Sequence, residues 1–137
     1  MKNLKVNEVA RHFDVSPDTV RHYVRIGLLQ PGKDESGYHR FLPADLKVLG
    51  FILNARELGF TLDDIRQLLD DADKGESPCP HAREMIELRL SQARQKLASL
   101  QALVSRMEEA TEAWRVMPDC SPCGEHICHL IEGVNHE

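Results

Sequence analysis

The chain has 137 residues, which is enough for one domain and an extended element. Aromatic residues make up only 5% of it and charged residues 28%, so a large compact core is not expected. No segment approaches the roughly 18 apolar residues that a membrane span needs, and the N-terminus lacks the apolar core of a signal peptide. We therefore expect a cytoplasmic protein without a membrane partner. In that compartment clustered thiols more often bind metal or do redox work than form disulfides.

The charge is distributed unevenly along the chain. The net charge of −5 would by itself disfavour a nucleic-acid partner. Residues 1–60, however, carry nine Lys and Arg against seven Asp and Glu, whereas residues 61–137 carry eight against fifteen. Phosphates would repel the acidic part, so we expect the N-terminal part to face DNA.

The first residues predict two short helices joined by a tight turn, over residues 7–13 and 17–26. Ser16 is a good N-cap, Pro17 suits the first helical position, and Gly27 is a natural left-handed terminator. Such a pair forms a helix-turn-helix, whose second helix usually enters the major groove of DNA. An ordinary αα-hairpin is the alternative.

The next segment predicts a small β-hairpin wing followed by two helices. Residues 28–29 and 38–41 are extended runs around a polar turn. A third helix is expected over residues 43–58. Thr61 then caps a fourth helix, with Asp64 three residues later in a position like that of a capping box.

After an acidic, breaker-rich stretch at residues 70–80, a periodic pattern predicts a long helix over residues 81–114. From Leu90 onward the apolar positions recur in alternating steps of three and four, which is typical of a coiled-coil seam. A helix of about 34 residues would span roughly 50 Å. The small N-terminal domain cannot bury so long a stripe, so we expect a homodimer. Packing back onto the same chain is the alternative.

Three of the four cysteines lie close together near the C-terminus. Cys120, Cys123 and Cys128 fall within nine residues that also contain His126, and Cys79 stands alone at the start of the long helix. Thiolates and imidazoles are soft ligands for Zn²⁺, Cd²⁺, Pb²⁺, Hg²⁺ or Cu⁺. Beside a DNA-binding module, this loop predicts the input of a metal-responsive switch. A structural disulfide or a structural zinc would explain the same loop.

Three segments in register resemble the MerR family of transcriptional regulators, and in particular its metal-sensing members. They are PDTVRHYVRIGLLQP at residues 17–31, GYHRF at residues 37–41 and the stretch ADLKV to Arg66 at residues 44–66. The resemblance covers at least residues 5–70, and the long helix and the cysteine loop follow in the family's order.

The resemblance implies a mainly α fold. Its parts would be a winged helix-turn-helix DNA-binding domain with connecting helices (residues 1–75), a long antiparallel coiled-coil dimerisation helix (76–116), and a metal-binding loop with a short helix at about residues 127–133 (117–137). It assigns DNA contacts to Arg21, Tyr23, Arg40 and His39, and we interpret Arg25, Lys33 and Lys47 as phosphate contacts. The family often has Arg at position 39, so His39 either weakens one contact or makes it depend on pH.

The resemblance also implies a ligand set. Cys120 and Cys128 frame a loop that copper and silver sensors of the family use alone, for a monovalent ion. Divalent sensors add a cysteine at the start of the dimer helix, and Cys79 occupies that place. We therefore assign Cys79 of one protomer with Cys120 and Cys128 of its partner, which favours Zn, Cd, Pb or Hg.

The remaining loop residues keep several interpretations. Cys123 could bind the same ion, bind a second ion, or take no part. His126 is favoured as a further ligand, whereas His129 and His81 are interpreted as ordinary histidines.

The family mechanism would place the dimer on promoter DNA whose elements are spaced too widely for RNA polymerase. Metal binding would distort the DNA and activate efflux or detoxification genes, with the metal-free protein as repressor.

Catalysis is not expected. The chain has no phosphate-cradling Gly-rich loop and no Ser/His/Asp arrangement, and Cys120-x2-Cys123 lacks the βαβ framework of an oxidoreductase. The carboxylates at residues 63–64 and at residues 70, 71 and 73 are interpreted as helix-start and solvated surface charges. A DNA-binding protein with a purely structural zinc remains an alternative.

Overall fold

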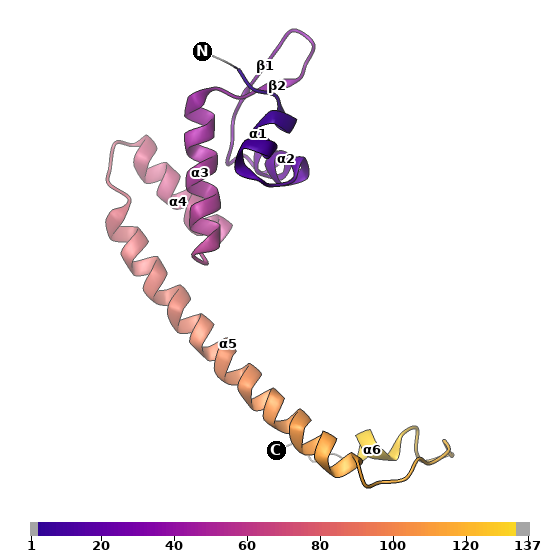
Figure 1. Cartoon of the computed structure of the whole chain (residues 1–137). Helices are drawn as coiled ribbons and strands as arrows, with labels where there is room; N and C mark the ends of the chain where they lie inside the picture. The colour runs from indigo at the N-terminus through magenta and orange to yellow at the C-terminus, as the bar shows by residue number, and fades with distance from the viewer. Residues whose placement is uncertain (1–2, 134–137) are drawn as a thin grey trace. The chain divides into compact units, whose positions relative to one another are not determined.

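The computed structural model describes residues 3–133, and this part of the chain is mainly helical, as predicted. Figure 1 shows the elements, which are α1 (Val6–Phe13), α2 (Pro17–Arg25), β1 (Gly32–Lys33), β2 (His39–Arg40), α3 (Pro43–Glu57), α4 (Leu62–Asp73), α5 (Cys79–Trp114) and α6 (His129–Glu132). They divide into a first unit that ends at Arg89 and a second unit that begins at Leu90. Among the described residues, no helix combines the length and apolar character that a membrane span requires.

Helices α1 and α2 form the predicted helix-turn-helix. Asp14 adopts the left-handed conformation (φ 55°) and reverses the chain after α1. The Ser16 hydroxyl then accepts a hydrogen bond from the Thr19 amide at 3.1 Å, and Pro17 occupies the first turn of α2. Val9 and Val20 are fully buried where the two helices meet. Local capping thus sets the start of α2, and apolar burial holds it in place.

The wing, residues 32–40, is shorter than predicted and starts later. Leu28 and Leu29 form no strand, because their amides donate to the Tyr23 carbonyl at 3.0 and 3.1 Å and close the end of α2. Both side chains are buried in the core of the first unit. The strand lies at Gly32–Lys33 and pairs with His39–Arg40 in antiparallel register. The apolar residues 28–29 are therefore part of the buried core and not of a β-strand.

Helix α3 ends one residue before the predicted residue 58, and α4 begins after Thr61 as predicted. The predicted capping box of α4 is confirmed, since the Thr61 hydroxyl accepts from the Asp64 amide at 3.1 Å and the Asp64 carboxylate accepts from the Thr61 amide at 3.0 Å. The acidic stretch after residue 70 is partly helical, because α4 continues to Asp73 and α5 already begins at Cys79. Pro80 is compatible with that start because it lies in the first turn.

Helix α5 buries none of its residues within the single chain. In the second unit, the apolar side chains of the predicted seam are about half exposed, at 48% for Leu90 and 56% for Leu97, Leu100 and Met107. The predicted C-terminal helix at residues 127–133 is shorter in the structure and covers His129–Glu132. The seam in the second unit therefore has no partner among the described residues.

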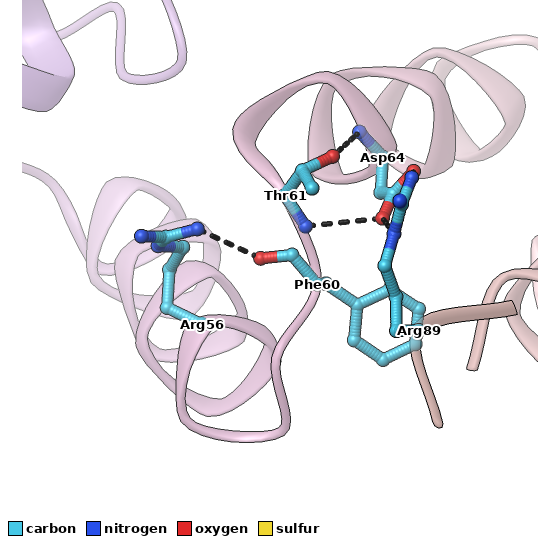
Figure 2. A network of polar contacts seen from close by, with 5 residues as sticks. All are labelled: Arg56, Phe60, Thr61, Asp64 and Arg89. Atoms are coloured by element: carbon cyan, nitrogen blue, oxygen red, sulfur yellow. Dashed lines mark hydrogen bonds and ion pairs between the residues drawn. The ribbon is translucent and has the colours of Figure 1, made fainter. Parts of the chain in front are cut away.

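Asp64 and Asp71 are buried and paired. Asp64 stands at the helix start as predicted, whereas the interpretation of Asp71 as a solvated surface charge was wrong. Arg89 of α5 grips Asp64 with two hydrogen bonds, from Nε to Oδ2 at 2.7 Å and from Nη2 to Oδ1 at 2.8 Å (Figure 2). Near the other end of α4, His81 Nδ1 lies 2.6 Å from Asp71 Oδ2. Neither pair could be predicted from the sequence pattern, because the two residues of each pair lie on different helices.

The hydrogen bonds from Arg89, reinforced by those from Thr61, outweigh burial and lower the pKa of Asp64 to about 2 from its usual 3.8. A carboxylate with a lowered pKa contributes stability that is present above the unfolded-state pKa and is lost as the pH falls through the folded-state pKa.

We therefore expect the difference in unfolding free energy between the wild type and Asp64→Asn to shrink by about 2 kcal/mol as the pH falls from about 5 to below 2. Urea unfolding across this range measures that difference. The exposed neighbour Asp63, changed to Asn, is the control, since it removes the same charge without breaking the hydrogen bonds of Arg89. A constant difference for Asp64→Asn would contradict the assignment.

Candidate functional site

A basic groove of about 700 Å³ lies in the first unit between α2 and the wing. Its lining residues are Lys5, Val6, Asn7, Arg21, Val24, Arg25, Asp34, Ser36, Gly37, Tyr38, His39 and Arg40. Four of the residues predicted to contact DNA thus share one surface, whereas Tyr23, Lys33 and Lys47 do not line it. The sequence analysis missed Lys5, because this residue precedes the first predicted helix.

The cations of α2 in the basic groove are held only loosely. Arg21 Nη1 donates to Asp18 Oδ1 at 3.0 Å, and both side chains are more than half exposed. Arg25 lies 3.3 Å from His22 Nδ1. Exposed pairs of this kind contribute little, so a phosphate can replace Asp18 as the partner of Arg21 at small cost.

Tyr23 and His39 are held mainly by packing. Tyr23 is only 7% exposed and belongs to the core of the first unit. The His39 ring lies 6.4 Å from that of Phe41, and its buried Nδ1 has no hydrogen-bond partner among the described residues. Their DNA contacts stay predictions. The Tyr23 ring is already buried in the core of the first unit.

Asp34 organises the wing. Its Oδ1 accepts hydrogen bonds from the amides of Ser36 and Tyr38 at 2.9 and 3.1 Å, and its Oδ2 accepts from Arg40 Nε at 2.9 Å. Partial desolvation raises the pKa of Asp34, but these hydrogen bonds, with that from Tyr38 foremost, lower it overall. Asp34-Glu-Ser-Gly37 is a turn-forming segment in which the Asp side chain can accept from the amide two residues on, so this Asx-turn could have been identified from the sequence. Arg40 therefore shapes the wing as well as lining the groove.

Asp34→Ala should weaken binding to promoter DNA about fivefold, because the turn and the orientation of Arg40 are lost. Glu35→Ala is the matched control, since it removes the same charge from an exposed neighbour. It should bind as tightly as the wild type or slightly more tightly. Fluorescence anisotropy on one DNA fragment compares the two, and equal affinities would contradict the role of Asp34.

The four cysteines are free thiols. Cys79, Cys120 and Cys123 are exposed and Cys128 is half-buried. Cys79 belongs to the first unit and the other three to the second. Within residues 3–133 of one chain, no three His, Cys, Asp or Glu side chains gather into a group that could hold a metal ion. Accessible, unpaired thiols nevertheless fit a soft metal by their donor chemistry.

The cysteine loop is ordered by contacts with and around α6. The Cys123 amide donates to the His126 carbonyl at 3.0 Å, which makes a turn inside the loop. Glu132 accepts from the Ile127 amide at 3.0 Å and lies 3.4 Å from His126 Nδ1. His129 Nε2 donates to the Pro118 carbonyl at 2.9 Å. The loop thus has a defined shape, and two of its histidines already have partners.

His81 lies two residues after Cys79 in sequence but points to a different face of α5. Its Nδ1 donates to Asp71, and this hydrogen bond raises the pKa of His81. Residues two apart on a helix lie about 200° apart around its axis, so the two side chains do not share a face. His81 therefore ties α5 to α4.

Comparison with protein families identifies this architecture. Residues 4–72 match the family described as MerR HTH family regulatory protein, and residues 46–110 match the one described as MerR, DNA binding. The chain belongs to the MerR family of transcriptional regulators.

Metal-responsive proteins are among the relatives of this MerR-family chain. It is 30% identical to the HTH-type transcriptional regulator ZntR of Escherichia coli K12 over 111 residues, or 80% of this chain and 79% of ZntR. It is 33% identical to the mercuric resistance operon regulatory protein of Pseudomonas fluorescens, over 88% and 85% of the two chains. The structure of PbrR691 from Ralstonia metallidurans CH34 in complex with lead(II) superposes with a TM-score of 0.73, at 26% identity over 96% and 99%. These relatives are regulators of transcription rather than enzymes.

Proposed function

We propose that this MerR-family protein is a cytoplasmic, metal-responsive regulator that binds promoter DNA as a homodimer and activates detoxification genes together with RNA polymerase. The observation that carries the proposal is the set of four free thiols on a MerR framework. Exposed cysteines on a DNA-binding scaffold have a direct use as metal ligands. The effector is a divalent soft or borderline ion, namely Zn²⁺, Cd²⁺, Pb²⁺ or Hg²⁺.

The basic groove supports the DNA-binding part of the proposal. Lys5, Arg21, Arg25 and Arg40 line it against a single carboxylate, Asp34, which already holds the wing. Arginine side chains grip phosphates and can also read guanine through paired hydrogen bonds. Helix α2 would enter the major groove, and the wing would follow the adjacent backbone.

The exposed stripe of α5 supports the homodimer, and its phase extends to Cys79. Cys79 precedes Ile86 by seven residues, and Ile86, Ala93, Leu100 and Met107 continue at the same spacing. Cys79 is thus in phase with the stripe by spacing, while Ile86 between them packs against the core of its own first unit. In an antiparallel pair, the start of one helix meets the end of the other, where Cys120 and Cys128 follow in the partner's sequence.

The ligands of one ion would then come from both protomers. Cys79 of one chain joins Cys120 and Cys128 of the other, and Cys123 or His126 completes the four ligands that Zn²⁺ prefers. Because α5 begins at Cys79, a bond at its thiol acts on the helix that carries Arg89 and His81. Allosteric coupling of about 1–3 kcal/mol approaches the cost of deforming a short DNA site, which is of order 1–6 kcal/mol.

Cys79→Ser should weaken binding of the divalent ions by more than about 100-fold, because loss of one ligand costs roughly 3 kcal/mol. Anaerobic titration of the reduced dimer, followed by thiolate-to-metal absorption, measures this change. Cys123→Ser, which removes an exposed thiol of the cysteine loop, should have a smaller effect, because His126 can supply the fourth ligand in its place.

Two outcomes of this titration would point elsewhere. Tight Cu⁺ binding that is indifferent to Cys79→Ser would make the protein a monovalent Cu(I) or Ag(I) sensor using Cys120 and Cys128 alone. Unfolding of the protein by a chelator would indicate a purely structural zinc.

Leu97→Glu should raise the dimer dissociation constant at least about 30-fold, since it places a charge in an apolar seam at a cost of roughly 2 kcal/mol or more. Ala102→Glu is the matched control, because position 102 lies about 140° around the helix from Leu97 and about 160° from Leu100 and Val104, on the face opposite the seam. Sedimentation equilibrium compares the two variants. A dimer that tolerates Leu97→Glu would contradict the proposed seam.

A further inference from the structure

Arg66 of α4 makes a long-range contact with the end of the recognition helix α2. Its Nη2 donates to the Ile26 carbonyl at 2.9 Å, which joins residues forty positions apart. Ile26 is the C-cap of α2, and Gly27 next to it adopts a left-handed conformation (φ 86°). A cation at a helix C-terminus also complements the helix dipole. Arg66 thus fixes the end of α2 by a directional bond, in addition to the non-directional packing of the core.

Helix α4 is in turn fastened to α5 near both of its ends. Asp64 in its first turn is gripped by Arg89, and Asp71 in its last turn binds His81. Between these pairs, the buried Ile65 and Leu68 belong to a core against which Ala82, Met85 and Ile86 of α5 pack. Close-packed interiors resist internal shear, so α4 and the start of α5 move together.

A continuous set of contacts therefore runs from the start of α5 to the end of α2. It begins two residues from Cys79, crosses to α4 through His81 and Asp71, and reaches Ile26 through Arg66. Every contact in it lies within the first unit. A change in the position of α5 can reach the recognition helix along this route without passing through the wing.

We propose that Arg66 is a positioning residue. Through its hydrogen bond to Ile26, α4 couples the metal-bound or metal-free state of α5 to the position of the recognition helix α2. The inference rests on the proposed metal-responsive function. Arg66 lies outside the basic groove and supplies no metal ligand in that proposal. Its side chain is exposed, so replacing it leaves no cavity in the core.

The test substitutes Arg66 by Met, which keeps the length of the side chain and removes the hydrogen bond. Arg56→Met is the matched control, since Arg56 Nη1 also donates to a backbone carbonyl, that of Phe60 at 2.9 Å, but within the α3–α4 turn (Figure 2). Arg66→Lys retains a charge and a donor, so it tests rescue.

Three quantities are measured for each full-length dimer, together with thermal unfolding. The first is the affinity for the ion, among Zn²⁺, Cd²⁺, Pb²⁺ and Hg²⁺, that the wild type binds most tightly. The second is the affinity of the metal-free protein for a promoter that the wild type recovers from genomic fragments. The third is the metal-dependent increase in transcription from that promoter. Arg66→Met should bind metal and metal-free DNA within about threefold of the wild type, while the transcription increase falls about fivefold or more, the range of a lost coupling. Arg66→Lys should give an intermediate increase, and Arg56→Met the full one.

A full metal-dependent increase in Arg66→Met would overturn the inference. So would an equal loss in Arg56→Met, because it would trace the effect to general stability. Should Arg66→Met fail to fold, Arg66→Ala decides, and an increase equal to that of the wild type overturns the inference. A wild type that responds to none of the four ions would instead refute the proposed function, and the inference with it.

Discussion

The fold of the first unit depends on the two hydrogen bonds that the Arg89 guanidinium donates to the Asp64 carboxylate. The same carboxylate closes the capping box of α4 and accepts the guanidinium of α5, so one side chain both starts one helix and docks another. Removing either partner would leave a charge in a partly buried site, which costs more than the intact pair contributes. This constraint docks the start of α5, up to Arg89, against α4 within the first unit.

Helix α4 is consequently the centre of the unit rather than a connector. It holds α5 by carboxylates near both ends and holds α2 by Arg66. Its apolar side chains join the shared core, so these polar contacts are anchored by packing. An element with such contacts on two sides can couple them, because a close-packed core transmits displacement instead of absorbing it.

The two proposed functional surfaces make different demands on the protein. The basic groove is assembled within one unit of one chain, and its cations on α2 are loosely held and can exchange partners. The cysteines are divided between two units and gather no metal-binding group within residues 3–133 of a single chain. A site completed only between protomers would make metal binding depend on the dimer, as a switch requires.

The sequence by itself determined the helices, their caps and the ligand chemistry. Ser16-Pro17 and the Thr61 capping box act over a few residues, and the spacing of the α5 seam is local periodicity, so all three could be predicted. Only the tertiary structure decided that residues 28–29 are core rather than strand, that Asp64 and Asp71 are buried ion-pair partners, and that Arg66 reaches Ile26. These features join residues that are distant in sequence or on different elements. Their energy comes from burial and from partners that no local pattern specifies.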